Sequence, residues 1–175
     1  PGYIERALQR FQHPMPSRPE HAPHAWQKPI YGAKTQYAPG PDSAPAIDAT
    51  DTKRLQEVLG TLLFYARAVD STMLPTISTL ASQQAHGTTA TMEALTQLLN
   101  YCASHPDATI RYYASDMMLY VHSDASYLTA PKARSRVAGY HYLSDFPHDP
   151  SKAPKPNDPL PPPNGAINVL CQILR

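Results

Sequence analysis

The sequence predicts an α+β protein in which a helical bundle is followed by a three-stranded antiparallel meander. Between residues 51 and 106, apolar side chains recur every three to four positions in three successive stretches, as on the buried faces of helices. From residue 117 onward, apolar and polar residues alternate in further stretches, as in strands with one buried face. Helices followed by strands make the predicted class α+β.

Proline divides the chain into folded and irregular parts. Of the 20 prolines among 175 residues, eight lie in residues 14–45 and eight in residues 147–163. Because proline disfavours helix interiors and central strands, neither stretch is expected to form regular structure. We expect the first to be an extended arm that Trp26 and Tyr31 hold against a folded surface. The second is expected to be a long loop between strands.

Four helices are expected in the first two thirds of the chain. A short amphipathic helix covers residues 2–12, and the bundle comprises helices over residues 51–69, 71–85 and 89–103. Short connections between the last three predict antiparallel packing. Gly60 lies inside the first bundle helix, where glycine costs about 1 kcal/mol against alanine, so we expect close packing against another helix there.

Three strands are expected in the last third. Residues 117–143 resemble two strands of an antiparallel hairpin, and residues 166–174 alternate as a third strand. The β-rich run over residues 109–113 is expected to pair with the start of the hairpin.

One acid, Asp124, is expected at the exit of the first strand, on the same face as Tyr120 and His122. A carboxylate at a strand end is a common metal ligand, whereas the alternative is an ordinary turn-forming aspartate. The turn that follows carries three basic residues, which either bind phosphates or are simply solvated: Lys132, Arg134 and Arg136.

Composition excludes several classes of protein. With 15 basic and 14 acidic residues the net charge is +1, so nucleic-acid binding requires a local basic patch. Cys102 and Cys171 show no metal-ligand spacing and suggest no disulfide framework, which favours a reducing compartment. No apolar run approaches about 20 residues, so no membrane contact is expected. Both ends are expected to be cuts in a longer protein, because the chain starts at Pro1 without methionine and stops in a strand-like run.

Several motifs resemble one known family. The run Ser123-Asp124-Ala125, followed by Arg134-Ser135 and Gly139-Tyr140, resembles the start of the ribonuclease H domain of copia-type long-terminal-repeat retrotransposons. Tyr3-Ile4-Glu5-Arg6 resembles the helix that follows the polymerase palm in that family. Residues 59–65 resemble its Leu-x-Gly-x-Leu-x-Tyr helix. The motifs occur in the family's order.

The resemblance implies a division of the chain. Residues 1–12 would follow the palm, 13–50 would be the arm, 51–106 a thumb or connection bundle, and 107–175 a truncated ribonuclease H-like three-stranded meander. It implies that Asp124 is a catalytic aspartate and a Mg²⁺ ligand. It also implies contact with an RNA–DNA hybrid or a template–primer duplex, with the rest of the Pol polyprotein, and an intracellular location in cytoplasm, nucleus or virus-like particle.

The predicted active sites are incomplete. Two-metal hydrolysis requires several carboxylates, and the chain has no second acid expected to converge on Asp124. No Asp-Asp pair, as in the polymerase Tyr-x-Asp-Asp motif, occurs in the sequence. We therefore expect a fragment of a reverse transcriptase and ribonuclease H polyprotein that is inactive alone. The alternative is a non-catalytic helical interaction module with a β appendage.

Overall fold

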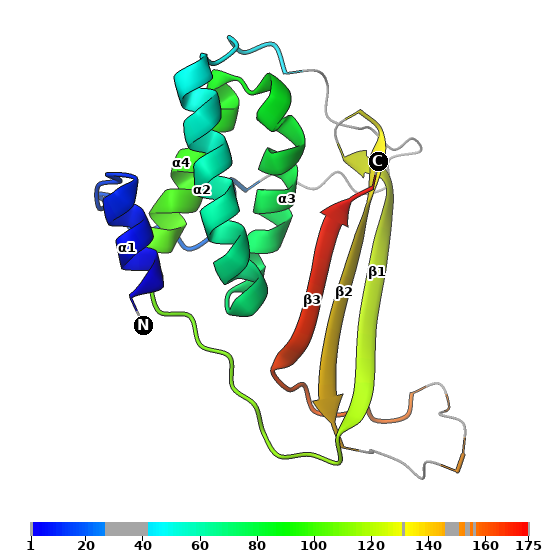
Figure 1. Ribbon diagram of the computed structural model, residues 1–175. Coiled ribbons are helices and arrows are strands. Elements are labelled where there is room, and N and C mark those ends of the chain that lie inside the picture. Colours follow the sequence, from blue (N-terminus) through cyan, green and yellow to red (C-terminus); the bar gives the residue numbers. More distant parts are fainter. Residues whose placement is uncertain are drawn as a thin grey trace.

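The computed structural model describes residues 2–26, 42–130, 132–145, 151–152, 155 and 157–174. These residues form an α+β fold, with four α-helices and one three-stranded antiparallel sheet. The helices form one layer that lies beside the sheet, with β3 nearest to the helices and β1 farthest from them (Figure 1). The predicted fold class is confirmed at this level.

All four expected helices are present within the described residues, and a short 3₁₀ turn flanks each end of α3. Their bounds are α1 Tyr3–Arg10, α2 Ala49–Ala68, α3 Leu74–Gln83 and α4 Thr89–Ser104. In this part of the chain, none of the helices is both long enough and apolar enough to cross a membrane.

Local capping explains where the longer helices begin. The side chain of Asp48 accepts a hydrogen bond from the backbone N–H of Asp51 and so satisfies one free donor at the start of α2. At the start of α4, Thr88 and Thr91 exchange side-chain and backbone hydrogen bonds as a capping box.

One apolar core unites the helices. The leucines on the inner faces of α2 and α4 are almost fully buried in a shared cluster, as the periodicity predicts: Leu59, Leu62, Leu95 and Leu98. Ile4 and Leu8 bring α1 into the same cluster. Val169 and Cys171 of β3 pack against its rim, so the sheet is attached to the helices through its nearest strand.

Two expectations about packing are wrong. A Cβ built on Gly60 would meet nothing within 4 Å, so this glycine faces solvent rather than a neighbouring helix. The indole of Trp26 is 78% exposed and does not hold the arm, while Tyr31 lies outside the described residues. Instead, hydrogen bonds attach residues 13–21 to the C-terminal half of α4 and to the residue after it, joining His13 to Asn100, Glu20 to Ser104 and His21 to His105.

The strands form the predicted meander. β1 Met118–Ala130, β2 Arg134–Ser144 and β3 Ala166–Ile173 pair antiparallel in the order β1-β2-β3. The expectation of a further strand over residues 109–113 is wrong, because residues 105–117 contain neither helix nor strand. This segment instead runs from α4 past the start of β3 to the start of β1 (Figure 1).

Candidate functional site

Asp124 lies within β1 rather than at its exit. It pairs with Ala138 of β2, and the strand continues to Ala130. The expectation of a strand-end acid is therefore wrong, because the hairpin extends further than the apolar alternation indicated. The carboxylate is exposed, and its Oδ1 accepts a hydrogen bond from the N–H of Ala125 at 2.8 Å.

The face that carries Asp124 agrees with the expectation. Tyr120 pairs with Tyr142, and His122 pairs with Tyr140, so these side chains share a face with Asp124. The ring of Tyr142 lies 5.3 Å from that of His122, and its hydroxyl is 3.2 Å from His122 Nε2. Because Tyr142 is only 1% exposed, this aromatic cluster holds the β1–β2 surface beside Asp124 in one arrangement.

The three basic residues of the hairpin are not gathered around Asp124. Lys132 is exposed in the turn, and Arg134 pairs with Ala130 at the end of the hairpin. Arg136 shares the face of Asp124, but its guanidinium donates to α3, to the carbonyl oxygen of Pro75 and to Thr79 Oγ1 at 2.7 Å. Arg136 therefore ties the hairpin to the helical layer.

Asp124 does not form a magnesium site with its neighbours. Across the described ranges, no group of three or more histidine, cysteine, aspartate or glutamate side chains is placed to hold a metal ion. Mg²⁺ prefers about six oxygen ligands, usually with one or two carboxylates among them. Asp124 contributes one carboxylate, and the described residues gather no group of three metal-binding side chains around it, so they do not complete this coordination by themselves.

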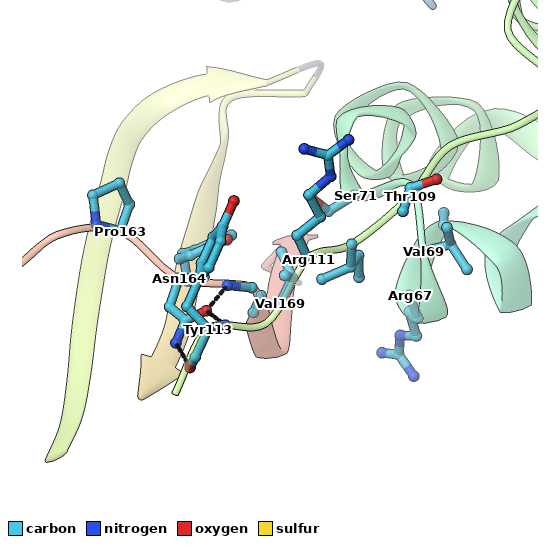
Figure 2. Close-up of a pocket in the computed structure, with 14 residues that line it drawn as sticks. Arg67, Val69, Ser71, Thr109, Arg111, Tyr113, Pro163, Asn164 and Val169 are labelled. Carbon is cyan, nitrogen blue, oxygen red and sulfur yellow. Dashed lines mark hydrogen bonds between the residues drawn. The ribbon is translucent and has the colours of Figure 1, made fainter. Parts of the chain in front are cut away.

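A second feature lies where the helices, the connecting segment and the sheet meet. A cavity of about 270 Å³ is bounded by the end of α2, by residues 109–113 and by the β2–β3 side of the sheet (Figure 2). Polar groups on its wall include two guanidiniums, two hydroxyls and a phenol, from Arg67, Arg111, Ser71, Thr109 and Tyr113.

Close backbone packing makes one wall of this cavity rigid. A Cβ on Gly165 would lie 2.6 Å from the carbonyl oxygen of Arg111 and 2.6 Å from a methyl carbon of Ile110. Only glycine therefore allows the connecting segment to approach the start of β3 this closely. The phenol of Tyr112 donates to the carbonyl oxygen of Ala166 at 2.9 Å and strengthens the same contact.

Sequence reasoning did not find the residues of this cavity. Arg67 lies in the last turn of α2 and Arg111 in an irregular segment, 44 positions later in the chain. Neither belongs to a motif, and no local pattern relates them. The signal that was present is the Asn164-Gly165 pair, a combination typical of turns, which here marks the point where the connecting segment docks.

Comparison with known proteins gives no family for the chain. No protein-family model matches it, and no match was found among curated proteins or solved structures.

Proposed function

We propose that the chain is part of a copia-type retrotransposon Pol polyprotein and acts in handling an RNA–DNA hybrid or a template–primer duplex. In this proposal, residues 51–106 belong to the thumb or connection region, and the meander begins a ribonuclease H domain. Asp124 supplies one carboxylate to a magnesium site, and the remaining ligands come from the rest of the longer protein.

The observation that carries the proposal is the placement of Asp124. Its carboxylate is exposed and stands on the strand face that it shares with Tyr120 and His122. The aromatic cluster around Tyr142 fixes this surface, and a carboxylate on a rigid strand is well suited to hold a metal ion in one position. The succession of helices and an antiparallel meander supports the same assignment.

A non-catalytic interaction module is the second candidate. It is favoured by the absence of other metal-holding groups among the described residues and by the exposed apolar side chains on the opposite face of β1. Leu119 is 56% exposed and Val121 is 49% exposed, so this face is open to contact with another surface.

Cleavage of a hybrid by the longer protein separates these candidates. Asp124→Asn in the full Pol protein should lower the magnesium-dependent cleavage rate at least about 100-fold, because changes to the partners of metal ligands alone cost 10–100-fold. Asp107→Asn, an exposed acid after α4, is the matched control and should cleave normally. Equal cleavage by Asp124→Asn and wild type would favour the interaction module.

The isolated 175-residue chain should cleave no hybrid and extend no primer, since its described residues do not assemble the required carboxylates. Magnesium-dependent cleavage by the purified chain that disappears in Asp124→Asn would show that this expectation of inactivity is wrong.

A further inference from the structure

Two cavities that share lining residues lie along β3 on the side of the helices and are together called the groove. The cavity of about 270 Å³ adjoins a second one of about 460 Å³ between α3 and β3, because both are lined by Arg67 and Val169. Together they extend from the connecting segment, at Arg111, to the beginning of β2, at Arg134.

The groove is basic although the chain as a whole is not. Arg111 lines the first cavity, Arg134 the second, and Arg67 both, while the described lining residues include neither aspartate nor glutamate. The acid nearest in sequence to Arg67 is Asp70, which is 6% exposed and accepts hydrogen bonds from Thr72 and Tyr101. Because the whole chain carries almost equal numbers of acids and bases, this positive groove is produced by the fold.

The arginines are spread out rather than converging. The guanidinium groups of Arg67 and Arg111 extend away from each other (Figure 2). Within the described residues, neither forms an ion pair with an acid. Separated positive charges do not suit a single small anion, which is better held by convergent donors. They suit a chain with anions at intervals along it.

An exposed aromatic residue, Tyr113, lies at one end of the groove. The backbone N–H and C=O of Tyr113 are both fixed by the side chain of Asn164, yet the tyrosine is 64% exposed. A basic groove with an exposed aromatic platform is the combination that binds single strands, with arginines on phosphates and bases stacked on rings. The hydroxyls of Ser71 and Thr109 on the same wall add neutral donors for phosphate oxygens.

We propose that this groove binds single-stranded nucleic acid, with phosphates at Arg111 and Arg67 and a base stacked on Tyr113. The inference extends the proposed function, on which it rests for the class of ligand, by giving a strand a path that is separate from Asp124.

Fluorescence anisotropy tests whether the groove binds a single strand. A labelled 12-nucleotide oligo-dT or oligo-U is titrated with the full chain at several salt concentrations. Each phosphate contact to a single strand contributes about 0.7 to the slope of log affinity against log salt. Arg67→Ala and Arg111→Ala should each lower the slope by about 0.7 and weaken binding about fivefold at 0.1 M salt. Tyr113→Leu should weaken binding at least about fivefold with an unchanged slope.

Arg18→Ala is the matched control, since it removes the same charge from an exposed position in the arm, and it should bind like wild type. Equal losses in Arg18→Ala and Arg67→Ala would overturn the groove, as would undetectable binding by wild type at low salt. Equal affinity for a 12-base-pair hybrid, with the same dependence on Arg67, would also overturn the single-strand assignment. The groove is tested by oligonucleotide binding and the proposed function by magnesium-dependent cleavage, so failure of the groove and failure of the proposed function give different results.

Discussion

Asn164 and Tyr113 are 51 positions apart and are joined by two reciprocal hydrogen bonds. Tyr113 N–H donates to Asn164 Oδ1 at 2.8 Å, and Asn164 Nδ2 donates to the carbonyl oxygen of Tyr113 at 2.9 Å. The same side chain accepts from Gly165 N–H and donates to the carbonyl oxygen of Leu143. All four hydrogen-bonding positions of one amide are therefore used to fasten the connecting segment to the sheet.

Asn164→Ala should destabilise the protein by about 2–4 kcal/mol, because it leaves several largely buried backbone groups without partners. Asn164→Asp should also be destabilising, since a carboxylate cannot donate to the carbonyl oxygens of Tyr113 and Leu143. Urea denaturation measures both. Asn168→Ala, at an exposed position of β3, is the control and should change stability by less than about 0.5 kcal/mol. A similar loss in both alanine variants would contradict this role of Asn164.

Two glycine-to-alanine substitutions should have opposite effects. Gly165→Ala places a methyl group 2.6 Å from the backbone oxygen of Arg111, so the connecting segment must move and stability should fall by about 1–3 kcal/mol. Gly60→Ala meets nothing within 4 Å in a helix interior and should raise stability by about 0.8–1 kcal/mol. Thermal midpoints measured side by side provide the check. A stabilising Gly165→Ala would show that the close approach is not required.

The neighbouring residues Leu62 and Leu63 belong to the same helix but differ in how deeply their side chains are buried, so alanine substitutions at the two positions should differ in cost. Leu62 is 1% exposed within the shared core, so Leu62→Ala should cost about 2–5 kcal/mol. Leu63 is 38% exposed one position later in α2, and Leu63→Ala should cost less than about 1 kcal/mol. Chemical denaturation of both variants compares them. Equal losses would contradict the assigned face of α2.

Stability should decrease in alkaline solution through Cys102. Burial, with a further contribution from the charge of Asp70, raises the pKa of this thiol from 9.0 to about 12. Above pH 9 the unfolded chain loses the proton while the folded protein retains it. The stability that the neutral thiol provides is therefore complete below pH 9 and is lost as the pH rises toward 12.

The loss should reach up to about 1.4 kcal/mol per pH unit in that range. Free energies of unfolding measured from pH 8 upward should fall less steeply in Cys102→Ala than in wild type. The same slope in Cys102→Ala and wild type would show that Cys102 does not cause the alkaline loss.

Much of the candidate site was beyond sequence reasoning because its parts are not local. The alternation around Asp124 correctly placed it with Tyr120 and His122, but the length of the hairpin depends on pairing with β2, which alternation alone does not report. For Arg136 the sequence leaves phosphate binding and solvation open, yet its guanidinium donates a hydrogen bond to Thr79 of α3, 57 positions away in the sequence.

What the sequence determined by itself is the kind and order of the elements. A repeat of three to four residues or of two residues records which side of a local segment is buried, so four helices and three strands could be identified within the described chain. Tertiary structure alone decided that residues 109–113 join no strand, that Gly60 faces solvent, and that Arg67 and Arg111 line one groove. These outcomes depend on contacts between segments that are distant in the sequence, such as the contact of Asn164 with Tyr113. Such contacts produce no periodic pattern of apolar residues in the local sequence, so they cannot be predicted from it.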